Sequence, residues 1–175
     1  MTPVLLLSHL AHSDDWVCAR LDRWRTPVWL ELGLVAATHL GDGWVWLAVV
    51  LAALARGDHT PSRALFEAAS AIVVVNVAQV LLKHAFRRSR PRSARPPSVR
   101  APDPFSFPSG HAMNAFAVAV LVGTHLPWGL PWALAAAACV GTSRVVLRIH
   151  YVTDVAAGAL LGSVLAAFLA SVLGV

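Results

Sequence analysis

Residues 83–91 read KHAFRRSRP and residues 107–111 read FPSGH, and together they bound the one long polar stretch in an otherwise apolar sequence. The segment between them is rich in Pro and Arg, and the apolar pattern resumes directly after His111. Arginine guanidinium groups offer forked N–H donors, and the free N–H groups at a helix start offer more. A cationic loop that enters a helix through Ser-Gly-His is therefore suited to holding an oxyanion.

The composition around this stretch is that of a membrane protein. The chain has 175 residues, of which 57% are hydrophobic and 13% are charged, and its mean hydropathy is +0.64. Soluble domains average about 25% charged residues. We therefore expect an all-α, polytopic membrane helix bundle that forms a single domain over residues 1–175.

The positive charge does not indicate a nucleic-acid-binding protein. The net charge is +5, but half of the basic residues lie in one loop between apolar segments, and no aromatic residues interleave with them as a nucleic-acid platform requires. These basic residues are Lys83, Arg87, Arg88, Arg90, Arg92, Arg95 and Arg100. We predict no nucleic-acid partner, and no pattern in the chain indicates an oligomeric state.

The apolar pattern predicts about six transmembrane helices and a short N-terminal interfacial helix. Residues 8–25 mix charged positions with Trp, which is typical of a helix lying at the membrane surface. The apolar segments 26–40 and 43–56 are each short for a span of about 20 residues. We favour two helices with a turn at Gly41-Asp42-Gly43, and a single broken span is the alternative. Further helices are expected near residues 64–86, 109–125, 132–147 and 153–175.

The order of these helices brings three polar clusters to one side of the membrane. Helices ending near residues 86 and 147 finish on the side where helices begin near residues 109 and 150. His150 and Asp154 are four residues apart, which places them on one helical face. A carboxylate there can hold one ring nitrogen as N–H and leave the other as a lone pair. His150 is therefore a candidate nucleophile.

The remaining groups suit transfer of a phosphate-like anion. His111 could protonate a leaving oxygen as a general acid. Lys83, Arg90 and Arg144 would neutralise the oxyanion and the charge of the transition state. The sequence lacks the grouped carboxylates that a magnesium site needs, so we expect metal-independent chemistry without a cofactor.

Three motifs together resemble the type-2 phosphatidic acid phosphatase superfamily over about residues 64–165. They are Lys83-x6-Arg90-Pro91, Pro108-Ser109-Gly110-His111 and Ser143-Arg144-x5-His150-x3-Asp154. The resemblance implies a six-helix membrane bundle with an extracytoplasmic active site and a phosphohistidine mechanism. It also implies His150 as nucleophile, Asp154 as its orienting partner and His111 as general acid. The implied phosphate-binding residues are Lys83, Arg90, Ser109, Gly110 and Arg144.

These observations predict an integral membrane phosphatase, in a bacterial inner membrane, that acts on a lipid phosphate or a polyprenyl diphosphate. The alternative is a non-catalytic protein that binds or transports lipid phosphates on the same scaffold. The rule that basic loops lie in the cytoplasm favours the opposite orientation, but here the loop cations have a phosphate to bind. We expect the other loop arginines (Arg87, Arg88, Arg92, Arg95 and Arg100) to be solvated and to meet anionic lipid headgroups.

Overall fold

Apolar segments of the expected lengths form seven α-helices in the described part of the computed structural model. The structure describes residues 3–55, 63–92, 99, 101 and 103–174. The helices are α1 (Pro3–Arg23), α2 (Val28–His39), α3 (Gly43–Ala55), α4 (Arg63–Phe86), α5 (Gly110–His125), α6 (Leu130–Val146) and α7 (Val152–Leu173), with a 3-10 helix η1 (Pro127–Gly129) between α5 and α6. The predicted all-α class is confirmed, since within the described ranges β-structure is limited to an isolated bridge between Ser89 and Phe105.

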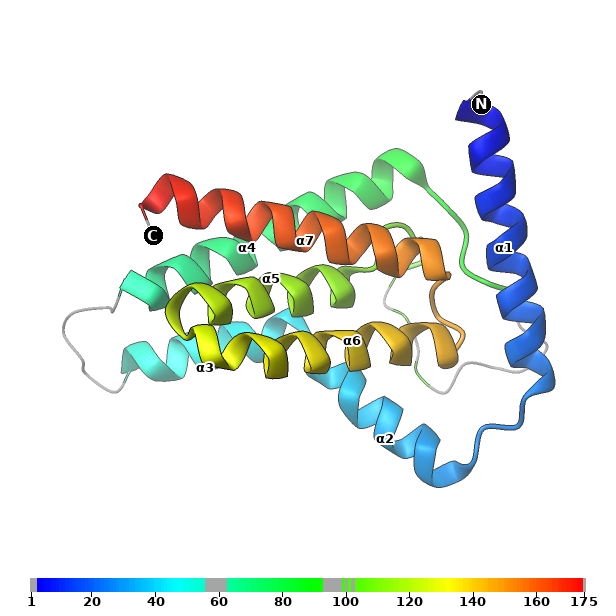
Figure 1. Ribbon diagram of the computed structural model, residues 1–175, viewed down its shortest axis with the longest axis horizontal. Helices are drawn as coiled ribbons and strands as arrows, with labels where there is room; N and C mark the ends of the chain where they lie inside the picture. The colour runs from blue at the N-terminus through cyan, green and yellow to red at the C-terminus, as the bar shows by residue number, and fades with distance from the viewer. Residues whose placement is uncertain (1–2, 56–62, 93–98, 100, 102, 175) are drawn as a thin grey trace.

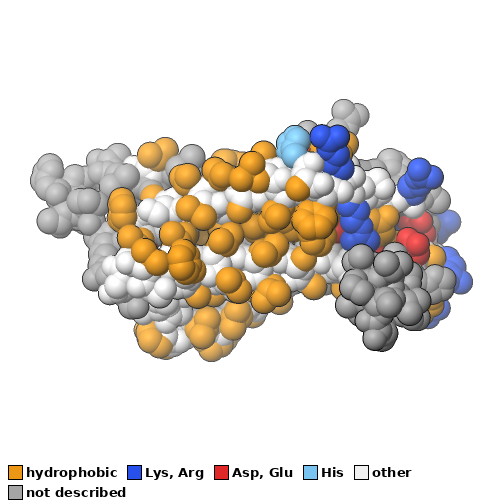
Figure 2. Space-filling view, turned by 90° about the horizontal axis from the view of Figure 1, so that it is seen from above, with side chains coloured by type: hydrophobic (Ala, Val, Ile, Leu, Met, Phe, Trp, Pro, Cys, Tyr) orange, Lys and Arg blue, Asp and Glu red, His pale blue; other side chains and the backbone are white. Residues whose placement is uncertain are grey.

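The flanks of the bundle expose apolar side chains. Among the described residues, three segments are long and apolar enough to cross a membrane: Phe66–Phe86, Pro127–Val146 and Val152–Leu173. Large apolar residues on α4 and α7, such as Leu81 and Phe168, are more than half exposed. Figure 2 shows this apolar surface along the molecule, with charged side chains gathered toward one end. Such a surface is stable in lipid rather than in water, and the chain is an integral membrane protein.

The segment 28–55 forms two helices, as favoured from the sequence, but they do not turn back on each other. In Figure 1, α2 and α3 follow one another along the bundle with a bend between them, whereas α4 to α7 each run along it. This path matches the alternative of one broken segment. The number of membrane spans stays a prediction.

Helix α5 lies at the centre of the bundle, against α4, α6 and α7. Its contact with α7 is close because α7 presents Gly158 and Gly162 to it. A Cβ added at Gly158 would lie 2.6 Å from the Ser109 carbonyl oxygen, and one at Gly162 would lie 2.1 Å from the Met113 carbonyl oxygen. The Gly-x-x-x-Gly pair therefore lets the backbones of α5 and α7 approach one another.

One end of the bundle carries the polar segments. The described residues between α4 and α5 and the connection between α6 and α7 both lie there, and α1 runs across this end rather than along the bundle (Figure 1). Helix α1 begins earlier than the predicted residues 8–25. Its Trp16 side chain is 65% exposed, as expected of an aromatic residue at a membrane surface.

Candidate active site

A small cavity at the polar end of the bundle is lined by six of the predicted site residues. It measures about 100 Å³, which is room for a small oxyanion or a few water molecules. The predicted residues in its lining are Lys83, Arg90, Gly110, His111, Arg144 and His150. The structure thus brings residues from all three motifs to one place. Two further predicted residues, Ser109 and Asp154, lie behind this lining.

His150 lies in the connection between α6 and α7 and is almost fully buried. Its Nε2 atom is 3.2 Å from Nη1 of Arg90. Because an arginine N–H can only donate, Nε2 must accept, and the ring proton of a neutral His150 is on Nδ1. Nδ1 faces Oδ2 of Asp154 at 3.5 Å, close enough for an ion pair but too long for a well-formed hydrogen bond. Burial, aided by the charges of Arg90 and Arg144, lowers the pKa of His150 to about 4, although its contact with Asp154 opposes the shift.

Lys83 and Arg90 share one carboxylate, that of Asp103, which the sequence did not identify. Lys83 Nζ donates to Asp103 Oδ2 at 2.7 Å, and Arg90 Nη2 lies 3.3 Å from Oδ1. Partial burial alone would raise the pKa of Asp103, but the hydrogen bond from Lys83 and the nearby charges hold it below its usual value. Arg90 is also held by the Ile149 carbonyl oxygen, to which Nη1 donates at 3.0 Å. Both cations are therefore fixed in place beside the cavity.

His111, in the first turn of α5, also lies beside a carboxylate. Its Nε2 atom is 2.7 Å from Oδ1 of Asp42, in the bend between α2 and α3. Asp42 Oδ2 in turn lies 2.8 Å from Nδ1 of His39. A Cβ on Gly41 would fall 2.9 Å from Cβ of His111, so this bend can approach α5 because Gly41 has no side chain. The sequence identified the bend but not its contact with the histidine.

Arg144 is buried in α6, where its guanidinium meets α2. Its Nη1 atom donates to Thr38 Oγ1 at 2.9 Å, and Thr38 Oγ1 lies 2.9 Å from Ser143 Oγ. Its Nε atom has no hydrogen-bond partner among the described residues. Buried N–H groups are nearly always paired, so a free donor beside the cavity suits a group that receives an anionic ligand.

The Ser109-Gly110 pair starts α5 against α7 and α4. The Ser109 N–H donates to the Asp154 backbone carbonyl at 3.0 Å, so this particular N–H is not free for a ligand. Ser109 Oγ is buried and has no hydrogen-bond partner within the described part of the chain. A Cβ on Gly110 would fall 1.5 Å from Oε1 of Gln79. Only glycine fits there without displacing the Gln79 amide from the cavity lining.

Arg88 does not behave as a solvated loop residue. Its Nη1 atom donates to Oδ1 of Asp154 at 2.7 Å, and its guanidinium lies 4.0 Å from the centroid of the Tyr151 ring. The prediction for Arg88 was therefore wrong: two acidic side chains that are distant in sequence draw it into the structure. Arg92 is exposed, as predicted, whereas Arg95 and Arg100 lie outside the described residues.

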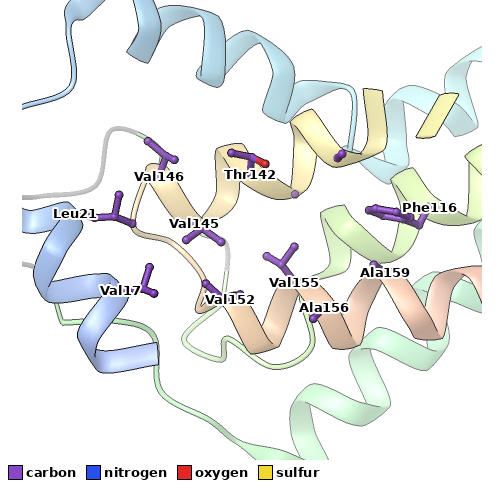
Figure 3. Close-up of a pocket in the computed structure, with 12 residues that line it drawn as sticks. Val17, Leu21, Phe116, Thr142, Val145, Val146, Val152, Val155, Ala156 and Ala159 are labelled. Atoms are coloured by element: carbon purple, nitrogen blue, oxygen red, sulfur yellow. The ribbon is translucent and has the colours of Figure 1, made fainter. Parts of the chain in front are cut away.

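An apolar groove of about 440 Å³ runs between α6 and α7 and is closed at one end by α1. Figure 3 shows side chains from α6 and α7 that face each other across it, such as Val145 and Val155, with Phe116 of α5 farther along and Val17 and Leu21 of α1 at the other end. Its α6 lining directly flanks the Ser143-Arg144 pair, and its α7 lining directly flanks Asp154. The groove thus starts on the same helix ends that carry the polar cavity.

A membrane helix bundle with a buried and a partly buried histidine, two arginines and a lysine around a cavity of this size suits a membrane phosphatase. Residues 64–174 match the family model of the PAP2 superfamily. The chain belongs to this superfamily. It is the family that the three motifs resemble.

Relatives of known activity agree with this class. The chain is 36% identical, over 78% of its length and 77% of the relative's, to decaprenylphosphoryl-5-phosphoribose phosphatase of Mycobacterium tuberculosis. It is 33% identical, over 78% of its length and 72% of the relative's, to phosphatidylglycerophosphatase B of Bacillus subtilis. Among solved structures, a transmembrane PAP2-type phosphatidylglycerolphosphate phosphatase from Bacillus subtilis superimposes with a TM-score of 0.75 at 29% identity, covering 94% of this chain and 86% of that one.

Proposed function

We propose that this phosphatase cleaves a terminal phosphate from a membrane lipid through a phosphohistidine intermediate, without a metal ion. The observation that carries the proposal is the convergence of His150, His111 and three cationic side chains on one cavity of about 100 Å³. Phosphoryl transfer depends mainly on positioning and on charge stabilisation. These groups supply both.

Binding would begin with the cations. The phosphate would take the place of Asp103 as the partner of Lys83 and Arg90, and it would also accept from the free Nε of Arg144 and the hydroxyl of Ser109. Lys83, Ser109 and Arg144 lie at or near helix ends, and Arg90, in the segment after α4, is held by the Ile149 carbonyl oxygen. Once Asp103 has been displaced, the developing charge on the equatorial phosphate oxygens would therefore be stabilised by donors that are already in place.

The chemistry would then proceed in two steps. The Nε2 lone pair of His150 attacks phosphorus, the bond from phosphorus to the lipid oxygen breaks, and His111 gives that oxygen a proton. Water next attacks the phosphohistidine, with His111 taking its proton, which releases inorganic phosphate and restores both histidines. Asp154 would stabilise the positive charge that the His150 ring carries between the steps.

The lipid chain would lie in the apolar groove between α6 and α7. The groove lining is almost wholly apolar, and it flanks the helix ends that bear Arg144 and Asp154. A lipid in the bilayer would reach the cavity sideways, with its phosphate leading. Both relatives described above are named as phosphatases of phosphate-bearing lipids, which favours a phosphate monoester on a lipid headgroup. We place the active site at the extracytoplasmic face of a bacterial inner membrane.

The experiment measures phosphate release by the detergent-purified protein with a chelator present. The lipids offered in parallel are phosphatidic acid, phosphatidylglycerophosphate, undecaprenyl diphosphate and decaprenylphosphoryl-5-phosphoribose. The His150→Ala variant serves as the control. We expect release from at least one lipid, resistance to the chelator, and loss of at least about a thousandfold in kcat for the variant.

Other results would change the assignment. Turnover by folded His150→Ala at the wild-type rate would remove His150 as the nucleophile. Phosphate release that stops when the chelator is present would indicate a metal-dependent reaction. Absence of release from all four lipids, by a protein shown to be folded, would favour the lipid-phosphate-binding or transport alternative.

A further inference from the structure

Asp14 is a buried carboxylate on α1, outside the residues matched by the family model. Only 2% of the residue is exposed. A carboxylate that is buried is costly unless it is paired and hydrogen-bonded. The hydrogen-bond partners of Asp14 therefore explain how its carboxylate can be buried.

Those partners are the start of α7 and the guanidinium of Arg88. Asp14 Oδ1 accepts from the Thr153 backbone N–H at 3.1 Å, and Oδ2 accepts from the Thr153 hydroxyl. Oδ2 also accepts from Arg88 Nη2 at 2.7 Å. Thr153 is in the first turn of α7, where backbone N–H groups have no partner within the helix. Asp14 therefore caps α7 from another helix, with its negative charge at the positive end of the helix dipole.

Arg88 connects this carboxylate to the one beside His150. Its Nη2 atom binds Asp14, while its Nη1 atom binds Oδ1 of Asp154 at 2.7 Å. The other oxygen of Asp154, Oδ2, faces Nδ1 of His150. One guanidinium thus bridges two carboxylates, and the second of them touches the proposed nucleophile.

The net charge of Asp14, Arg88 and Asp154 affects the His150 ring. The two carboxylates and the guanidinium of Arg88 together leave a net charge of −1 on the Nδ1 side of the His150 ring, whereas Arg90 lies on the Nε2 side. Without the charge of Asp14, Arg88 would pair with Asp154 alone and cancel most of its field at the ring. Asp154 would then stabilise the positively charged ring less, and its carboxylate would be drawn toward Arg88 and away from His150.

We propose that Asp14 is a positioning residue, which acts through Arg88 and Thr153 to hold Asp154 against His150 with its charge available to the ring. The role rests on the proposed function, since it presumes that His150 is the nucleophile. It makes α1 part of the catalytic apparatus rather than only a membrane-surface helix.

The test compares Asp14→Asn with Asp15→Asn in the full-length protein, using whichever of the four lipids named above the wild type cleaves fastest. Asp15 is the exposed neighbour of Asp14 on the same helix, which makes it a matched control. We expect Asp14→Asn to lower kcat about tenfold while KM changes less than about twofold, because the cations that bind the phosphate are untouched. Asp15→Asn should keep the wild-type kcat.

A second variant separates a positioning role from a structural one. Arg88→Gln leaves Asp14 buried without its cationic partner, so adding Asp14→Asn should raise kcat above that of Arg88→Gln alone. Asp14→Asn would then lower kcat in the wild-type background and raise it in the Arg88→Gln background. Such a reversal of sign requires that the two residues act through each other. It also keeps the proposal testable if Asp14→Asn alone does not fold because Arg88 loses its partner.

Three results would overturn the proposal. The first is equal kcat for folded Asp14→Asn and Asp15→Asn. The second is a change confined to KM, and the third is a double variant no more active than Arg88→Gln. If the wild type is active and His150→Ala is not, these results reject the role of Asp14 alone. Full activity of His150→Ala would instead reject the proposed function.

Discussion

At the scale of single residues, each histidine of the cavity has a carboxylate beside it. Asp154 faces His150, and Asp42 lies 2.7 Å from His111. A histidine that moves protons needs a fixed ring orientation, because a small displacement lengthens the hydrogen bond to the reacting oxygen. Asp42 reaches His111 from the bend between α2 and α3, so this half of the site depends on a region without a motif.

We therefore expect Asp42→Asn to lower kcat by about tenfold to a hundredfold. The amide retains the size of the side chain but holds the His111 ring less firmly and stabilises its protonated form less. Steady-state phosphate release, with Asp15→Asn as the control, measures the effect. A kcat for Asp42→Asn equal to that of the control would show that His111 works without this partner.

The ionisation of His150 is a second property that belongs to this scale. Its pKa is lowered from an ordinary value of 6.5 to about 4, so the ring should be neutral, with its proton on Nδ1, at pH 5.5. Ring ¹⁵N chemical shifts in detergent micelles, assigned with His150→Ala, report both features. Exposed histidines are charged at pH 5.5. An imidazolium signal for His150 at this pH would therefore contradict the argument that burial lowers its pKa.

Sequence reasoning reached the site residues that lie at or near helix ends, including Asp154 as the partner of His150, and missed the acidic partners that come from other segments. Lys83, Arg90 and His150 could be predicted because helix order alone brings their segments together. Asp14 and Asp103 could not, because each meets its cation through a contact between segments that carry no shared pattern. Arg88 was misassigned for the same reason: an arginine in a basic loop shows its burial only when its carboxylates are located.

At the scale of elements, the contact between α5 and α7 decides how well the site is held. Ser109 at the start of α5 binds the backbone of Asp154 in α7. Farther along, Gly158 and Gly162 let α7 lie directly against the α5 backbone. The two helices that carry His111 and Asp154 are thereby packed against each other over most of their length.

Gly162→Ala should destabilise the protein by about 1–3 kcal/mol, since the added methyl would meet the Met113 backbone and force the helices apart. The matched control is Gly33→Ala in α2, where nothing lies within 4 Å of the added Cβ. That change should leave the unfolding temperature equal or higher, because alanine favours a helix over glycine. Thermal unfolding in detergent compares the two. Equal unfolding temperatures would mean that the close contact between α5 and α7 at Gly162 does not limit the stability of the protein.

The helices themselves were largely predictable from apolar length and from the Gly and Pro residues between them. The bounds of α4, α5 and α7 lie within a few residues of the expected ones. The path of α2 and α3 could not be settled, because each is too short to identify as a span and a Gly-Asp-Gly bend serves a hairpin or a broken helix equally. The contact between Asp42 and His111 holds the bend against α5.

At the scale of the whole molecule, the charged groups gather at one end while the flanks are apolar (Figure 2). The orientation of that end determines which side of the membrane receives the released phosphate. The rule for basic loops would place it in the cytoplasm. However, Lys83 and Arg90 are bound to Asp103 beside the cavity, and Arg88 is bound to two carboxylates, so these cations do not serve as free topological anchors.

We expect the cavity end to face the outside of the cell. In a chain with Cys18 and Cys139 replaced by serine, Arg92→Cys introduces a thiol at an exposed position of the loop beside the cavity. A membrane-impermeant maleimide should label it in intact bacteria. Labelling only after the cells are permeabilised would reverse the orientation.

The absence of side chains at Gly158 and Gly162 has one more consequence. With α5 and α7 locked backbone to backbone, the part of the cavity wall that α5 forms around His111 cannot yield. A headgroup larger than a phosphate must then be accommodated by the opposite side, where the α2–α3 bend and Asp103 border the cavity. Members of this superfamily that accept substrates of different size should therefore differ in those two segments, while the packing of α5 against α7 stays the same.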